Sequence, residues 1–267
     1  MPKLPAPPLP KALQPLPKRP GENGETTTPL ETAAEGGIHV VDWIDERTSL
    51  SGGIRWMLFR KVTKGINWIY TLGSATLFAF LNQAVTGVFL AMYYRPDASG
   101  GAYESIRYIT DDAFLGQLVR AMHKWGASVM IILIFLHMAR VFFFGAYKYP
   151  RELSWVIGVV LLILTLAMGF TGYLLPFDQR SYWATIVGVN INGTGPLIGP
   201  YQSDFLRAGP EFGATTLSRF YAIHMMLIPG LMAALIGAHL YLVSKLGISA
   251  PPWIHAEEPS EMRETKV

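Results

Sequence analysis

The sequence predicts an all-α membrane protein built around a bundle of four transmembrane helices. Hydrophobic residues make up 51% of the 267 residues and charged residues only 15%, which is too apolar for a typical soluble domain. Four apolar stretches are each long enough to cross a bilayer. Two of these stretches also carry a pair of histidines, and ionisable side chains inside a membrane usually serve a function.

Composition divides the chain into three segments. Residues 1–37 form a proline-rich tail that should be disordered, because eight of its first twenty residues are proline. It is either a simple tether or a docking arm for a partner. Residues 38–250 form the membrane domain, and 251–267 a short polar tail. Within 38–64, apolar residues such as Trp43 and Trp56 alternate with arginine and lysine, which predicts amphipathic helices at the membrane surface.

The predicted spans cover about 67–94, 118–144, 155–175 and 220–246. We expect Pro229 to kink the last one. An even number of spans puts both termini on one side of the membrane. Lysines and arginines crowd before the first span, between the second and third, and after the last, so both termini should be cytoplasmic in a plasma membrane.

Four histidines define the candidate site. His123 and His137 lie fourteen residues apart on the second span, about 21 Å along a helix and on nearly the same face. His224 and His239 lie fifteen apart on the last span. Each helix therefore offers one imidazole near each membrane face, which is what two stacked bis-histidine haems require. The alternative is that these histidines only form hydrogen bonds between helices.

Four glycines repeat this spacing on the other two spans. Gly73 and Gly87 are fourteen residues apart, as are Gly158 and Gly172. Glycine lets a large neighbour approach the backbone, so we expect haem clearance at these positions. Ordinary packing of small residues between membrane helices is the alternative.

Three arginines flank the histidines. Arg120 and Arg140 lie three residues outside the histidine pair of the second span, and Arg219 precedes the histidines of the last span. Arginine pairs strongly with carboxylates, so these side chains could bind haem propionates. They could equally be positive flanking charges at membrane ends.

Cysteine is absent, which excludes disulfides, cysteine-ligated iron–sulfur clusters and thioether-linked haem. Any haem must therefore be held non-covalently. The net charge of +3 is small, and we expect no nucleic-acid partner.

Four stretches resemble the cytochrome b of the quinol–cytochrome c reductases and of the cytochrome bf complex. They are TGVFLAMYY (86–94), PRELSW (150–155), TGYLLPFDQ (171–179) and TLSRFYAIH (216–224). The length and the unequal histidine spacings are most similar to the short, split form, in which a second membrane subunit carries the remaining helices. The family fold is a four-helix bundle with haems in its core.

The resemblance implies two b haems. His123 and His224 would ligate an outer, lower-potential haem, and His137 and His239 an inner, higher-potential one. It also implies quinol/quinone as substrate and quinone-site residues, for which the candidates are Tyr173, Tyr182, Trp183, Ser244 and Lys245. The implied partners are a Rieske iron–sulfur protein and a c-type cytochrome, in a dimeric complex.

The sequence departs from the family at three places. Thr71 stands where the form from oxygenic photosynthesis has a cysteine that attaches an extra haem. Ser244, followed by Lys245, replaces a quinone-binding histidine of the mitochondrial form, which puts the inner quinone site in doubt. The Pro-Glu-Trp-Tyr motif of the outer quinol site is absent and should lie on the partner subunit, since the similar Pro210-Glu211-Phe212 precedes the last span.

The resemblance thus implies a di-haem subunit of a quinol–cytochrome c, or quinol–plastocyanin-like, oxidoreductase that is catalytic only in its complex. Electrons would pass from an outer quinol-oxidation site across the membrane to an inner quinone-reduction site. One alternative is the cytochrome b anchor of a hydrogenase, formate dehydrogenase or other respiratory dehydrogenase. A histidine-lined transporter or proton channel is an alternative from another class.

Overall fold

The computed structural model describes residues 40, 42–48 and 66–252, which contain helices and no strand. Residues 42–48 are helical, with Trp43 exposed and the Arg47 guanidinium 4.2 Å from the centre of its ring. This turn agrees with the prediction of helix within 38–64. Most of that range, and nearly all of both predicted tails, lie outside the described residues.

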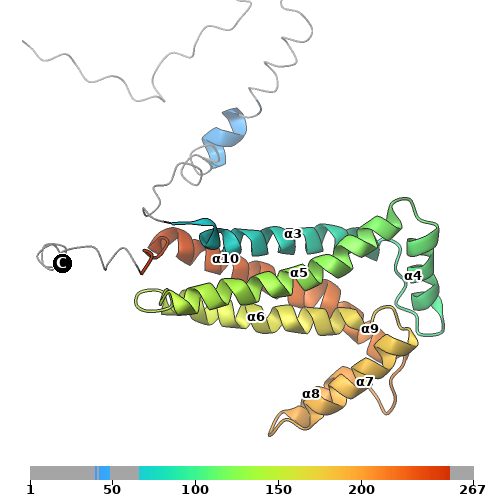
Figure 1. Ribbon diagram of the computed structural model, residues 1–267. Helices are drawn as coiled ribbons and strands as arrows, with labels where there is room; N and C mark the ends of the chain where they lie inside the picture. The colour runs from blue at the N-terminus through green and yellow to red at the C-terminus, as the bar shows by residue number, and fades with distance from the viewer. Residues whose placement is uncertain (1–39, 41, 49–65, 253–267) are drawn as a thin grey trace, which may run out of the picture. The chain divides into compact units, whose positions relative to one another are not determined.

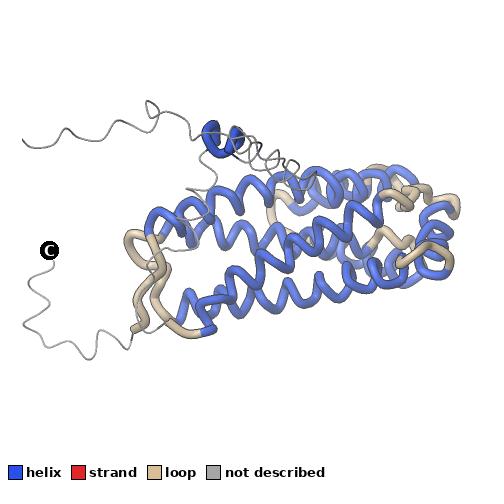
Figure 2. The backbone as a smooth tube through the Cα atoms, turned by 90° about the horizontal axis from the view of Figure 1, so that it is seen from above, coloured by secondary structure: helices blue, strands red, loops and turns tan. Residues whose placement is uncertain are grey.

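Four long apolar helical segments confirm the fold class (Figure 1). They have 24, 28, 22 and 33 residues. The segments are η2–α3 (Trp68–Thr71 and Leu72–Ala91), α5 (Gly116–Phe143), α6 (Glu152–Tyr173), and α9–η3–α10 (Ala214–Ala222, Ile223–Leu227 and Ile228–Leu246). They run alongside one another in both views of the backbone (Figures 1 and 2).

The last segment contains a π-helical turn, η3, in which Ile228 N–H donates to the carbonyl of Ile223. Pro229 follows directly and has no N–H, so it cannot donate to the carbonyl four residues earlier. The expected disturbance at this proline therefore takes the form of a wider turn just before it. That turn carries His224, which is buried.

The long helices form two close pairs, α3 with α5 and α6 with α10. Gly126 of α5 faces Asn82 and Gln83 of α3, where a Cβ would collide with both side chains. Gln83 is buried. In the amide orientation that satisfies both groups, its nitrogen donates to the carbonyl of His123 at 2.9 Å and its oxygen accepts from Ala127 N–H at 3.1 Å. These bonds fix α3 against the part of α5 that carries His123.

The connections at one end of the bundle are helical. They comprise α4 (Gly101–Asp111), which the sequence had not suggested, α7 (Gln179–Gly193) and α8 (Gly199–Arg207). Tyr182 lies near the start of α7, which extends over fifteen residues. Asp178 begins it by accepting a hydrogen bond from Ser181 N–H at 2.8 Å.

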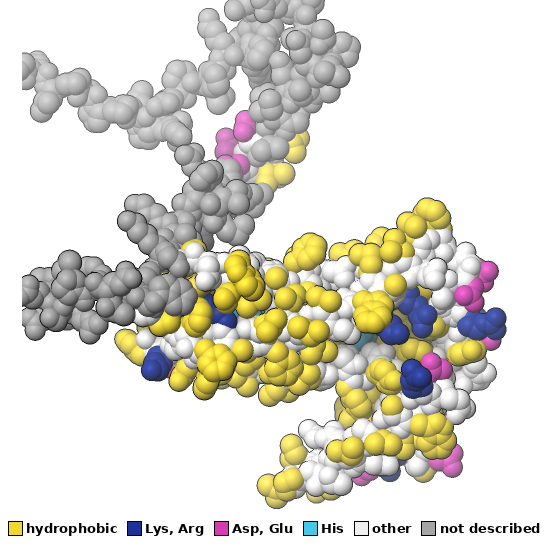
Figure 3. Space-filling view, in the orientation of Figure 1, with side chains coloured by type: hydrophobic (Ala, Val, Ile, Leu, Met, Phe, Trp, Pro, Cys, Tyr) yellow, Lys and Arg dark blue, Asp and Glu magenta, His cyan; other side chains and the backbone are white. Residues whose placement is uncertain are grey.

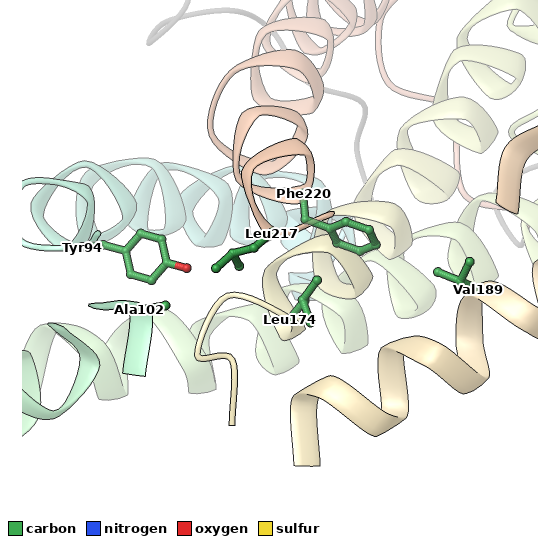
Figure 4. Close-up of a cluster of buried hydrophobic side chains, with 6 residues drawn as sticks. All are labelled: Tyr94, Ala102, Leu174, Val189, Leu217 and Phe220. Carbon is green, nitrogen blue, oxygen red and sulfur yellow. The ribbon is translucent and has the colours of Figure 1, made fainter. Parts of the chain in front are cut away.

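An apolar cluster joins these connections to the long helices. It contains Tyr94, Ala102, Leu174, Val189, Leu217 and Phe220 (Figure 4). The Tyr94 hydroxyl donates to the carbonyl of Leu175 at 2.6 Å, and burial raises the pKa of Tyr94, so this donor stays protonated. The cluster holds the chain at the ends of α3 and α6 against α9, about one turn before His224.

The outer surface of the long helices is apolar, and hydrophobic side chains cover most of their visible face (Figure 3). Phe78 of α3 and Phe143 of α5 are 75% and 78% exposed. Charged side chains gather mainly at the end that carries α4 and α7 (Figure 3). This distribution suits a bilayer, so the chain is a multi-pass membrane protein.

Candidate functional site

The structure brings His123 and His224 together. Their ring centres lie 6.4 Å apart, with the ring planes at 77° to each other. His123 comes from α5 and His224 from the π-turn η3, so the two close helix pairs each contribute one imidazole. We call this the outer pair.

The second pair, His137 and His239, comes from the same two segments toward their C-terminal ends. Each lies fourteen or fifteen residues beyond the histidine of the first pair on its own segment. We call this the inner pair. By their positions along the two segments, the four histidines therefore form two pairs at two depths.

Each histidine faces one of the four predicted glycines. A Cβ would lie 3.2 Å from His123 Cε1 if built on Gly87, and 3.1 Å from His137 Cε1 if built on Gly73. The same construction on Gly172 gives 2.5 Å to His224 Cε1.

The fourth glycine, Gly158, leaves 3.6 Å between such a Cβ and His239 Cε1, which is an ordinary contact. Both glycine helices therefore clear space at both depths. Clearance at a histidine is a more specific role than general small-residue packing.

Three hydroxyls that sequence reasoning missed contact the imidazoles. Thr86 Oγ1 lies 2.9 Å from His123 Nδ1, and Thr171 Oγ1 lies 3.2 Å from His224 Nδ1. At the inner pair, Ser154 Oγ lies 3.5 Å from His239 Nδ1. All three hydroxyls contact Nδ1, which leaves Nε2 available to a metal.

The donor set fits haem. Among the described residues, no cluster of three or more histidine, cysteine, aspartate or glutamate side chains could hold a bare metal ion. Each histidine pair supplies only two ligands, which suits an iron whose other four come from a macrocycle. The 6.4 Å between the ring centres of the outer pair leaves room for a metal ion between the two imidazoles.

The three predicted arginines differ in their surroundings. Arg140 lies over the Tyr70 ring at 3.7 Å, and its buried Nε and Nη2 have no acceptor among the described residues. Arg120 Nη1 donates to Thr110 Oγ1 at 3.0 Å, and Arg219 donates to the carbonyl of Phe205. Of these three arginines, only Arg140 has buried N–H donors without a partner among the described residues, which suits a residue that binds an anion.

The quinone-site candidates lie at the two ends of the bundle. Tyr173 ends α6 and is 47% exposed. Tyr182 and Trp183 follow on α7, where the Trp183 indole donates to Gln179 Oε1 at 2.9 Å. At the other end, Ser244 donates to the carbonyl of Tyr241 at 2.8 Å.

Lys245 of α10 lies over the Tyr241 ring at 5.7 Å, beside Ser244. Tyr173, Tyr182 and Trp183 thus lie at one end of the bundle, and Ser244 and Lys245 at the other. Their role in quinone binding stays a prediction.

The chain matches known proteins over most of its length. The family model described as cytochrome b/b6/petB matches residues 58–247. The menaquinol:cytochrome c reductase cytochrome b subunit of Bacillus subtilis (strain 168) is 42% identical over 220 residues, which cover 79% of this chain and 98% of that protein. Cytochrome b6 of Heliobacterium modesticaldum is 41% identical over 213 residues, which cover 79% of this chain and 100% of that protein.

A solved structure titled "Hyperthermophilic respiratory Complex III" contains a similar fold. Its matching chain is 32% identical, with a TM-score of 0.73. The match covers 83% of this chain and 59% of that chain. The chain described here therefore spans little more than half the length of that longer protein.

Proposed function

Because the chain belongs to the cytochrome b/b6 family, we propose that it is the di-haem cytochrome b subunit of a quinol–cytochrome c, or bf-like, oxidoreductase complex. The observation that carries this proposal is the grouping of four histidines into two pairs at two depths, each histidine facing a glycine. The family match goes against the dehydrogenase or hydrogenase anchor.

His123 and His224 would hold one b haem, and His137 and His239 would hold the other. When bound, each b haem would exchange one electron between the ferric and ferrous states. The glycines keep side chains away from the binding spaces, and the buried donors of Arg140 would receive a propionate of the inner haem. Arg120 and Arg219 would serve the outer haem in the same way after leaving their present partners.

The direction of electron transfer follows from the topology. With both termini cytoplasmic in a plasma membrane, the outer pair lies toward the outside and the inner pair toward the cytoplasm. Electrons would enter from quinol near Tyr173, Tyr182 and Trp183 and leave to quinone near Ser244 and Lys245. Moving one electron across the membrane against the potential costs about 2.3 kcal/mol per 100 mV, so quinol oxidation must supply that energy.

The partners follow from the relatives. The Bacillus protein is named as a menaquinol:cytochrome c reductase subunit, and we infer a comparable complex here. It would contain a second membrane subunit that completes the outer quinol site, a Rieske iron–sulfur protein and a c-type cytochrome. We expect the complex to be dimeric.

The test uses the complex purified with its natural partners. We expect a reduced-minus-oxidised spectrum with b-type bands, and b-haem reduction when quinol is added. Blocking the inner quinone site should increase that reduction, because the electrons lose their exit. A purified complex with no b-haem signal, or one whose b haem quinol cannot reduce, would contradict the proposal.

A further inference from the structure

Two buried threonines, Thr86 on α3 and Thr171 on α6, each contact one histidine of the outer pair. The contacts are 2.9 Å to His123 Nδ1 and 3.2 Å to His224 Nδ1. Thr86 is 4% exposed and Thr171 is 3% exposed, so water cannot replace either hydroxyl. Each helix that provides a clearing glycine thus also provides a hydroxyl, one residue earlier in the sequence.

Both threonine hydroxyls already donate their protons to backbone carbonyls. Thr86 donates to the carbonyl of Asn82 at 2.6 Å, and Thr171 donates to the carbonyl of Ala167 at 2.8 Å. A hydroxyl has one proton and two lone pairs, so each Oγ1 can only accept from the imidazole. Nδ1 therefore carries the hydrogen in both outer histidines, and Nε2 keeps the lone pair that a metal needs.

The inner pair lacks this arrangement. Ser154 Oγ lies 3.5 Å from His239 Nδ1, at the limit of a hydrogen bond, and donates to no carbonyl in the described part of the chain. The Ser154 hydroxyl can therefore either donate to His239 Nδ1 or accept from it. The His137 ring has no hydrogen-bond partner within the described ranges, 40, 42–48 and 66–252. The two depths therefore differ in how firmly their ligands are held.

We propose that Thr86 and Thr171 are positioning residues that lower the reduction potential of the haem between the outer histidines. The proposal rests on the proposed function, in which that pair ligates a b haem. A hydrogen bond from Nδ1–H raises the basicity of the ligating nitrogen, and a more basic ligand stabilises ferric iron relative to ferrous iron. At the inner pair the described residues give one hydroxyl contact, the longer one between Ser154 and His239. The two threonines would therefore make the potential rise from the outer to the inner haem.

The experiment compares valine variants in the full complex. Thr86→Val and Thr171→Val remove the hydroxyl at nearly constant volume. Thr76→Val on α3 and Thr165→Val on α6 are matched controls, because these hydroxyls donate only within their own helices. The measurements are potentiometric titration of haem absorbance and electron paramagnetic resonance of the ferric outer haem.

Each outer-pair valine variant should shift the ferric-to-ferrous ratio of the outer haem up to about tenfold toward ferrous, equivalent to about 59 mV for a one-electron couple. The inner haem and both control variants should keep their potentials. The ferric resonance of the outer haem should change as well, since it reports the ligand field of the two imidazoles. An unchanged outer potential in both variants, or an equal shift in the controls, overturns the proposal.

Serine variants separate the hydrogen bond from packing. Thr86→Ser and Thr171→Ser keep the hydroxyl, and both should retain the original potential. Loss of the outer haem from a valine variant, with its retention in the serine variant, also supports the proposal. Loss from both overturns it. Absence of b haem from the unmodified complex would instead contradict the proposed function.

Discussion

The His224 imidazole packs against the backbone of Gly172 so closely that a Cβ at this glycine would lie 2.5 Å from its Cε1 atom. The corresponding distance at Gly158 and His239 is 3.6 Å. A Cβ built on Gly73 or Gly87 gives intermediate distances, 3.1 and 3.2 Å from the Cε1 atoms of His137 and His123. The glycine requirement is therefore graded, and it is strictest at Gly172.

This gradation makes alanine substitution informative. Gly172→Ala should displace His224 and cost about 1–3 kcal/mol as an overpacked site, with loss or perturbation of the outer haem. Gly158→Ala should be tolerated, because its new methyl group meets only an ordinary contact. Haem per polypeptide and the haem absorption bands of the purified complexes measure both effects. A greater loss of haem in Gly158→Ala than in Gly172→Ala would show that the glycines do not act by making room for the histidines.

Arg140 provides a second prediction, because its buried Nε and Nη2 lack acceptors among the described residues. Arg140→Gln removes a positive charge near the inner haem, which should favour the ferric state by about 1–2 kcal/mol and lower the inner potential. Arg140→Lys keeps the charge and should retain most of that potential.

Redox titration of the inner haem tests the role of Arg140. Arg207→Gln is the control, since this α8 side chain donates to Asn190 Oδ1 of α7, at the other end of the bundle. If neither glutamine substitution changes the reduction potential of the inner haem, Arg140 does not contact that haem.

The membrane fold could be predicted because a bilayer forces every backbone polar group to bond internally, which leaves long helices as the solution for apolar stretches. Histidines fourteen and fifteen residues apart then fix two depths by helix geometry alone. Glycines at the same spacing indicated the helices that face them. These features depend on distances along single helices, which a sequence gives directly.

The threonine contacts were missed because they depend on the rotation of one helix against another. Thr86 reaches His123 only in the observed packing of α3 on α5. A signal was nevertheless present, since threonine precedes both outer glycines, whereas Leu72 and Ile157 precede the inner ones. The π-turn before Pro229 was also missed, because a proline predicts a disturbance but not its form.

The absence of cysteine leads to a prediction about attachment. Both haems should be extracted completely by acid acetone, because the chain has no thiol to form a thioether bond. A denaturing gel of the purified subunit, stained for haem, measures any haem that stays attached to the polypeptide. A haem-stained band at the position of this chain would be incompatible with purely axial histidine ligation.

The order of the two haems can be tested with His137→Leu. Leucine suits a bilayer, so α5 should still insert, but the inner haem loses a ligand. The outer pair lies about 21 Å away along α5 and should be little disturbed. After quinol addition, the outer haem should be reduced but should not reoxidise through the inner quinone site. Normal reoxidation, followed as haem absorbance with and without an inner-site inhibitor, would contradict the outer-to-inner order.

The central claim is that the four histidines act as two pairs grouped by depth. The most direct measurement is the haem content and potentiometric spectrum of four complexes, each with one histidine replaced by leucine. His123→Leu and His224→Leu should lose the same, lower-potential haem, while His137→Leu and His239→Leu should lose the other. If the losses instead group by helix, with His123 and His137 affecting one haem and His224 and His239 the other, the two-layer arrangement is wrong.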